Sequence, residues 1–267
     1  MNVGIVGIGT IGKKVASELD RNIIPGVGVS ALCSRNLPRA SDFAASLSSK
    51  PRVVPLDSLP GLCDLVIEVA GADAVDSIVT TALTADTPVM VLSCGALLER
   101  EDLFELATRH NTRIHVPSGA IIGLDGLQAA SMGHVEKVTM ITRKPLDGLR
   151  GSPGVTNIGV DLDTLTEALE LFEGPVIEGF SLFPANVNVA AAVSMAGIGP
   201  TKTRLRVIAD PQVTRNTHDV VVEGEFGIMS FHIENVPSEE NPKTGRLTAL
   251  SILAYLKQLT SPIHLGI

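Results

Sequence analysis

The chain has 267 residues, enough for one large domain or two modest ones, and its 45% hydrophobic content excludes a disordered protein. A net charge of −8 argues against a nucleic-acid partner, because an acidic surface repels phosphate backbones. No apolar run is long enough for a membrane span, and the N-terminal segment lacks the basic flank and cleavage site of a signal peptide.

The first part of the chain, residues 1–120, alternates short apolar runs with amphipathic stretches. This pattern predicts an α/β fold with a parallel, doubly wound sheet covered by helices. The runs are rich in Val and Ile, as expected for strands buried on both faces. The expected strands are 2–8, 27–33, 65–69, 88–92 and 113–116, and the expected helices are 12–19, 38–47, 72–83 and 100–110.

The pattern changes near Ser118, and residues 121–241 predict a smaller α+β domain with mainly antiparallel strands. A last helix is expected over 247–259, and we expect the segment 242–267 to pack back on the first domain. In chain order, the second domain has expected helices at 124–132, 163–172 and 188–195, and expected strands at 136–143, 204–208, 219–222 and 226–234.

A glycine-rich turn, Gly7-Ile8-Gly9-Thr10-Ile11-Gly12, joins the first expected strand to the first helix. One glycine permits the tight turn, the next lets the backbone approach a pyrophosphate, and the third lets helix and strand pack closely. Free amides at the helix start then meet the anionic ligand. The turn therefore predicts a Rossmann domain that binds a nicotinamide dinucleotide, although glycines at this spacing also form ordinary turns.

The end of the second expected strand bears on the choice between NAD and NADP. An acidic residue normally binds the adenosine ribose hydroxyls there, and this chain has Cys33-Ser34-Arg35-Asn36 instead. We expect Ser34 and Arg35 to hold the 2′-phosphate of NADP, with use of NADP or of both cofactors. The alternative is that Arg35 is a solvated loop residue that stacks on adenine. Ala70 and Gly95 are further candidate cofactor contacts.

The three cysteines, Cys33, Cys63 and Cys94, are widely spaced and odd in number. This usage favours reduced thiols in a cytoplasmic protein over a disulfide framework. No Cys/His pair has zinc spacing, so we expect no metal. Cys94 is expected to be a small buried residue rather than a nucleophile, because hydride transfer needs no covalent step.

Longer motifs occupy the rest of the chain and are far more specific than the glycine turn. Together they resemble those of the L-aspartate dehydrogenase family, over nearly the whole length. The motifs are Ser93-Cys94-Gly95-Ala96, His115-Val116-Pro117-Ser118-Gly119-Ala120, Thr142-Arg143-Lys144-Pro145, Phe183-Pro184-Ala185-Asn186-Val187-Asn188, Asn216-Thr217-His218 and Glu234-Asn235-Val236-Pro237-Ser238.

The resemblance implies a Rossmann domain, a C-terminal catalytic and dimerisation domain, and a homodimer. It implies oxidative deamination of L-aspartate, with NAD or NADP, to iminoaspartate and then oxaloacetate and ammonia, and the reverse reductive amination. It also implies a link to NAD biosynthesis. In the family a histidine is catalytic and matches His218 here, while groups matching Ala120 and Asn188 contact the cofactor.

Histidine suits the base role because its unperturbed pKa lies near neutral pH. Its position alone favours a non-catalytic His218, either on the surface or hydrogen-bonded in the core. With the family resemblance, a catalytic His218 is favoured instead. Asn186 and Asn188 precede a helix, where asparagine is often a cap; the functional alternatives are substrate binding by Asn186 and a nicotinamide contact by Asn188. Lys144, Lys202 and Lys243 are candidates for holding the substrate carboxylates, although each is more often a solvated lysine.

Two other functions stay open at this point. One is a dehydrogenase or reductase of similar architecture, of the homoserine or dihydrodipicolinate type, against which the Phe183–Asn188 and Asn216–His218 motifs argue. The other is a non-catalytic sensor that binds NAD(P) and regulates a partner. The sequence leaves the cofactor preference, the physiological direction and the oligomer size undecided.

Overall fold

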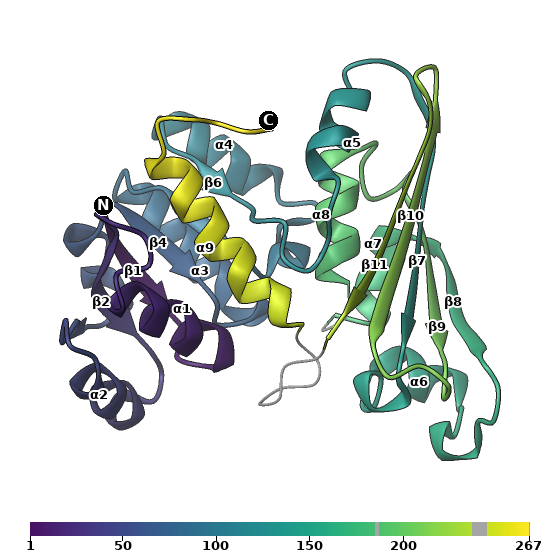
Figure 1. The fold of residues 1–267 in the computed structure, drawn as a ribbon, viewed down its shortest axis with the longest axis horizontal. Coiled ribbons are helices and arrows are strands. Elements are labelled where there is room, and N and C mark those ends of the chain that lie inside the picture. Colours follow the sequence, from purple (N-terminus) through teal and green to yellow (C-terminus); the bar gives the residue numbers. More distant parts are fainter. Residues whose placement is uncertain (185–186, 237–244, 267) are drawn as a thin grey trace. The chain divides into compact units, whose positions relative to one another are not determined.

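The computed structural model describes residues 1–184, 187–236 and 245–266, and the chain divides into two compact units. The first unit combines Met1–Pro117 with Ala249–Leu265, and the second comprises Ser118–Thr248. The expected fold class, an N-terminal Rossmann sheet followed by a second domain of helices and strands, is confirmed. Figure 1 shows both units in ribbon form.

The sheet of the first unit has six parallel strands in the order β3-β2-β1-β4-β5-β6. The sequence predicts all of them except β3, whose two residues are too few to show a period. Burial of Ile5, Leu32 and Ile67 explains the uniformly apolar strands. The strands are β1 (Asn2–Val6), β2 (Gly28–Cys33), β3 (Arg52–Val53), β4 (Leu65–Glu68), β5 (Val89–Val91) and β6 (Ile114–His115).

The helices of the first unit begin and end close to their predicted positions. Asn36 starts α2 by accepting a hydrogen bond from the Arg39 amide, and Asn111 follows α4 with a left-handed backbone (φ 48°). The helices are α1 (Thr10–Asp20), α2 (Leu37–Ser46), α3 (Ala72–Thr84), α4 (Glu101–Arg109) and α9 (Arg246–Thr260), with short 3₁₀ turns η1 (Leu56–Ser58), η2 (Pro60–Leu62) and η3 (Cys94–Leu97).

Helix α9 contributes its apolar residues to the core of the first unit. Ile252 and Leu256 are fully buried in one cluster with Val15 and Leu19 of α1 and with strands β1 and β2. Burial of one such side chain stabilises the fold by about 1.5–3 kcal/mol. The last helix of the chain is therefore part of the first hydrophobic core.

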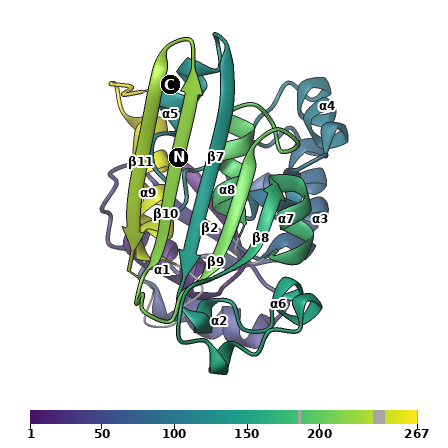
Figure 2. The same ribbon diagram turned by 90° about the vertical axis from the view of Figure 1, so that its right-hand side faces the viewer.

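The second unit contains a five-stranded sheet in the order β11-β10-β7-β9-β8, visible side by side in Figure 2. The expectation of an antiparallel sheet holds for three of the four strand pairs, but β7 and β9 are parallel. The connection between these two strands carries β8 and three helices, enough chain to return to the same end of the sheet. The strands are β7 (Val135–Lys144), β8 (Leu169–Pro175), β9 (Arg204–Ala209), β10 (Asn216–Gly224) and β11 (Gly227–Asn235).

Helices of the second unit gather on one side of its sheet, where α5, α7 and α8 lie together in Figure 1. Their small residues, such as Ala190, Ala191 and Gly179, allow close packing. The helices are α5 (Leu124–Ala130), α6 (Pro153–Ile158), α7 (Val176–Leu182) and α8 (Asn188–Ala196), with 3₁₀ turns η4 (Leu146–Gly148) and η5 (Leu162–Thr164).

The predicted helix at 163–172 is wrong. Its apolar spacing fits a helix, but the structure has the turn η5 followed by strand β8. Strand β8 pairs with β9, which lets Glu170 contact Arg206 at 2.6 Å and places Leu171 in the core. Sheet pairing and burial outweigh the weak helical preference of this segment.

Candidate active site

The glycine turn has separate structural reasons for its first and last glycines. Gly7 has a φ of 107°, and a Cβ there would lie 2.6 Å from the carbonyl oxygen of Val69. A Cβ at Gly12 would collide with the carbonyl oxygen of Gly7. These two residues therefore let β1, β4 and α1 approach each other closely, whether or not a ligand is bound.

Gly9 differs, because among the described residues no atom beyond its two chain neighbours lies within 4 Å of where its Cβ would be. Helix α1 begins immediately afterwards, at Thr10, without a side-chain cap and without an acidic residue in its first turn. The amides of Thr10, Ile11 and Gly12 thus lack an intrahelical partner at the positive end of the helix dipole. Open space beside free amides is a cradle that fits a dinucleotide pyrophosphate.

The end of β2 presents Ser34, half-buried, and Arg35, exposed. The Ser34 hydroxyl accepts a hydrogen bond from the Asn36 amide at 3.2 Å, which turns the chain into α2. The structure also brings a carboxylate to this strand end. Asp57 of η1 adds to the effect of burial in raising the pKa of the Cys33 thiol. It comes from the segment after β3, which the sequence pattern does not reveal.

Two further residues that are candidates for cofactor binding follow β4 and β5 in the chain. The amide of Ala70 donates to the Glu68 carboxylate at 2.7 Å, so this N–H is already used. Gly95 is buried in η3. Both residues lie after the carboxyl ends of parallel strands, the edge where open α/β sheets bind ligands.

In the second unit, polar side chains share one face at one end of the sheet. Thr142 and Lys144 are two residues apart on β7, so their side chains lie on the same face of the sheet. Asn216 and His218 have the same spacing on the neighbouring strand β10. His218 lies directly opposite Thr142. All four residues are at most 5% exposed. We call Thr142, Lys144, Asn216 and His218 the polar cluster. Four buried polar residues are costly in an apolar core, which points to a binding role.

His218 lies inside β10, not at the loop boundary that the sequence indicates, because the strand begins at Asn216. Its Nδ1 is 2.9 Å from the Thr142 hydroxyl. Burial, and then the charge of Lys144, lower the pKa of His218 to about 3. The imidazole is therefore neutral at neutral pH, as a proton acceptor must be.

Lys144 is the only one of the predicted carboxylate-binding lysines that the described residues place beside His218. Burial lowers the pKa of Lys144 to about 8, so most of the amine is still protonated at neutral pH. Asn216 lies nearby, since its Oδ1 and the Lys144 Cβ both flank Gly148. A buried ammonium beside amide groups is suited to a carboxylate ligand.

Ala120 is connected to the polar cluster through Asn235 of β11, which pairs with Asn216. The Asn235 side-chain amide, 4% exposed, donates to the Ala120 carbonyl at 2.8 Å. Asn188 is half-buried in the first turn of α8, whose cap residue is Val187. Sequence reasoning missed Thr142, Asn216 and Asn235 as site residues, although polar residues alternating along apolar strands were a usable signal.

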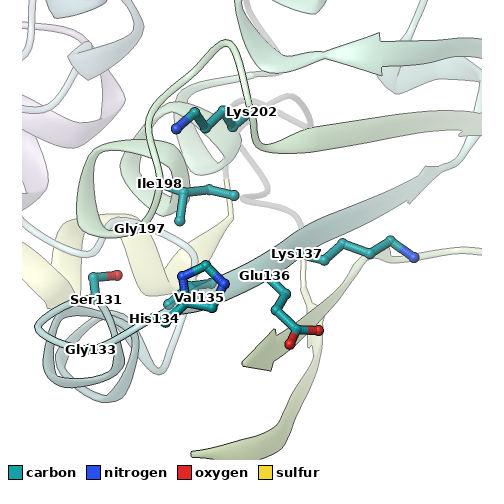
Figure 3. Close-up of a pocket in the computed structure, with 9 residues that line it drawn as sticks. All are labelled: Ser131, Gly133, His134, Val135, Glu136, Lys137, Gly197, Ile198 and Lys202. Carbon is teal, nitrogen blue, oxygen red and sulfur yellow. The ribbon is translucent and has the colours of Figure 1, made fainter. Parts of the chain in front are cut away.

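Among the remaining carboxylate candidates, Lys202 is not with the polar cluster. Lys202 precedes Arg204, which pairs with Thr139, so it lies at the other end of β7 from Lys144. It lines a cavity of about 740 Å³, in which the charged ends of Glu136 and Lys137 point away from Lys202 (Figure 3). Asn186 and Lys243 lie outside the described residues.

Other histidines have partners of a different kind. His110 contacts Asp86 at 2.9 Å and His232 contacts Asp219 at 2.6 Å, and both rings are substantially exposed. His115, at the end of β6, lies 2.9 Å from the Tyr255 hydroxyl. His218 differs in being enclosed, with a lysine as its charged neighbour.

Two kinds of feature are absent from the described residues. None of their helices combines the length and apolarity that crossing a bilayer requires. Within the same residues, no three His, Cys, Asp or Glu side chains are grouped as metal ligands would be.

Two family models match the chain. The C-terminal domain of aspartate dehydrogenase matches residues 125–259, which include the whole polar cluster. The NAD-binding domain of homoserine dehydrogenase matches residues 7–117, which include the glycine turn.

Individual relatives cover the full length. The chain is 44% identical to an L-aspartate dehydrogenase of Methanocella arvoryzae, covering 99% of this chain and 98% of the relative. It is 46% identical to one of Methanosarcina acetivorans, covering 100% and 99%. The crystal structure of aspartate dehydrogenase from Thermotoga maritima superposes with a TM-score of 0.75 at 30% identity, covering 100% and 99%. A homoserine dehydrogenase of Thiobacillus denitrificans shares the fold alone (TM-score 0.63, 15% identity, coverage 97% and 73%). The chain belongs to the L-aspartate dehydrogenase family.

Proposed function

We propose that the protein catalyses the NAD(P)-dependent oxidative deamination of L-aspartate to iminoaspartate, which water converts to oxaloacetate and ammonia. The observation that carries this proposal is the buried pair of His218 and Lys144 on adjacent strands, inside the segment that matches the aspartate dehydrogenase model. The reverse reductive amination uses the same groups. A supply of iminoaspartate to NAD biosynthesis fits this reaction.

The cofactor would be held by Gly7, Gly9, Thr10, Ile11 and Gly12, whose amides and open space fit a pyrophosphate. Ala70, Gly95, Ala120 and Asn188 are proposed contacts to the rest of the molecule. The bound nicotinamide supplies the acceptor for the hydride that leaves the α-carbon of the substrate. Neither unit alone contains all of these residues.

His218 is proposed to take protons. As a neutral imidazole it accepts one from the substrate amine, or from the water that attacks the imine carbon. The Thr142 hydroxyl at Nδ1 fixes the ring orientation. Positioned proton transfer of this kind accelerates reactions by about 10²–10⁴-fold.

Lys144 is proposed to bind a carboxylate of the substrate. An anionic carboxylate next to the buried amine would raise its lowered pKa again and keep it charged. Asn216 supplies a neutral hydrogen-bonding group at the same place. Asn186 is kept as a further substrate contact on the strength of the sequence motif. The position of Lys202 at the far end of β7 gives it no part in this proposal.

The cofactor is proposed to be NADP or NAD, with dual use. Arg35 is exposed and free to meet a 2′-phosphate, which supports NADP. Asp57, near Cys33, would repel that phosphate and supports NAD. These opposing charges favour an enzyme that accepts both.

A homodimer in the cytoplasm is the proposed state of the protein. The cysteines Cys33, Cys63 and Cys94 form no disulfide, as is usual in a reducing compartment. Ile228, on the edge strand β11, is 74% exposed, an apolar surface that a second copy could cover. Sedimentation velocity at two protein concentrations tests the dimer.

A spectrophotometric assay tests the activity. Purified protein is mixed with L-aspartate and NAD or NADP, and separately with oxaloacetate, ammonia and each reduced cofactor. The proposal expects an aspartate-dependent change in nicotinamide absorbance. Homoserine as the preferred substrate would support the other dehydrogenase, and cofactor binding without turnover would support a sensor.

A further inference from the structure

Glu68, the last residue of β4, is fully buried and is used by neither the glycine turn nor the polar cluster. Its Oε1 accepts hydrogen bonds from the amides of Ala70 (2.7 Å) and Gly71 (2.9 Å) and from the Ser93 hydroxyl (3.1 Å). Its Oε2 accepts one from the Ser93 amide (2.9 Å). One carboxylate therefore ties the segment after β4 to the segment after β5.

These two segments lie at the carboxyl edge of the parallel sheet, where dinucleotides bind in this fold. The segment after β4 also reaches the glycine turn, because the Val69 carbonyl is the group that a Cβ at Gly7 would meet. Glu68 thus sits at the junction of the ligand-facing ends of β1, β4 and β5. A shift of the Glu68 tether would change the shape of that edge.

A carboxylate is the side chain that this junction requires. The three amides and the hydroxyl that contact the Glu68 carboxylate are all hydrogen-bond donors. An ionised carboxylate accepts hydrogen bonds at both of its oxygens. Glutamine has the same shape, but its amide nitrogen can only donate. With one donor facing another, either the bonds from the Ala70 and Gly71 amides or the bond from the Ser93 amide must break.

We propose that Glu68 is a positioning residue for the nicotinamide cofactor: its carboxylate holds the segments after β4 and β5 in one arrangement around the ligand. This inference rests on cofactor binding at the sheet edge, as proposed above. It does not depend on L-aspartate being the substrate.

The test is the variant Glu68→Gln in the full-length protein, compared with wild type. Titration with NADH and NADPH gives the dissociation constants, and steady-state assays give KM for L-aspartate at saturating cofactor. Loss of a charge-assisted hydrogen bond predicts a cofactor dissociation constant raised by about tenfold or more, with KM for aspartate changed by less than about twofold. Equal changes in both constants, or an unchanged cofactor affinity, would overturn the proposal.

Two further variants keep the test decisive. Ser93→Ala removes one donor and keeps the charge, so cofactor affinity should fall by about two- to fivefold. If Glu68→Gln does not fold, an unchanged affinity in Ser93→Ala overturns the proposal. Glu173→Gln makes the same chemical change at an exposed position of β8 and should bind cofactor as wild type does. A wild-type protein that binds no cofactor would instead contradict the proposed function.

Discussion

The glycine turn and the polar cluster are two proposed binding regions built in opposite ways. In the turn, the groups proposed to face the ligand are backbone amides at the start of α1, and three of the six residues are glycines without a side chain. In the cluster, they are buried side chains on β7 and β10. The turn spans six consecutive residues, whereas Thr142 and His218 are 76 residues apart. A site made of backbone amides can therefore be recognised in a short stretch of sequence. Recognition of a site made of side chains depends on knowing how the strands pair.

The largest effect is expected at His218, the side chain of the polar cluster that is proposed to accept a proton. His218→Ala should lower kcat by about 10²–10⁴-fold, because no other group accepts the proton as efficiently. Cofactor affinity should stay within about twofold of wild type, since the turn is unaltered. Stopped-flow kinetics and cofactor titration measure the two quantities. Near-normal turnover would remove His218 from the mechanism.

Lys144 should show the next largest effect. Lys144→Met should raise KM for L-aspartate by about 10–100-fold, the value of a charge-assisted hydrogen bond, with cofactor affinity unaltered. Lys202→Met, at the other end of β7, is the matched control and should leave KM near wild type. A larger increase in KM for Lys202→Met than for Lys144→Met would assign carboxylate binding to Lys202 instead.

The lowered pKa of Lys144 also gives a stability prediction. The unfolded chain takes up the proton below about pH 10.5 and the folded chain only below about pH 8, so the free energy of unfolding falls as pH falls through this window. Below pH 8 this contribution is constant, at a cost of roughly 3 kcal/mol. Denaturant unfolding between pH 8 and 10 should show this slope in wild type and not in Lys144→Met.

Within the turn, Gly9 and Gly12 sharpen the comparison further. Gly9→Ala places a methyl group in open space, so stability should hold while the cofactor dissociation constant rises by about tenfold. Gly12→Ala forces a Cβ onto the Gly7 carbonyl and should cost about 1–3 kcal/mol of stability. Thermal melts and cofactor titration separate the two. Loss of stability in Gly9→Ala would mean that Gly9 serves the fold rather than the ligand.

The smallest effect is expected at Arg35. Arg35→Ala should weaken NADPH binding by about three- to tenfold, since an exposed cation at a phosphate is partly screened by solvent, and should leave NADH binding unaltered. Asp57→Asn should shift the preference towards NADPH. If Arg35→Ala weakens both cofactors equally, the guanidinium stacks on adenine instead.

The sequence predicts the first unit almost element by element, because buried parallel strands and amphipathic helices have strong local patterns. It fails at residues 163–172, where the helical spacing of Leu165, Leu169 and Phe172 hides the edge strand β8. His218 is identified from the family motif, and the register of β7 and β10 places Thr142 and Asn216 beside it. Glu68 has no sequence signal at all, since it ends an ordinary apolar strand.

The place of α9 in the first core has a consequence for synthesis of the chain. Ile252 and Leu256 fill the space beside α1 and β1, yet the ribosome makes them after the whole second unit. The amino-terminal sheet therefore waits with an open apolar surface while more than half of the polypeptide is still being translated. Premature termination upstream of residue 249 would leave that surface uncovered in the finished product, which makes such fragments targets for chaperones and proteases.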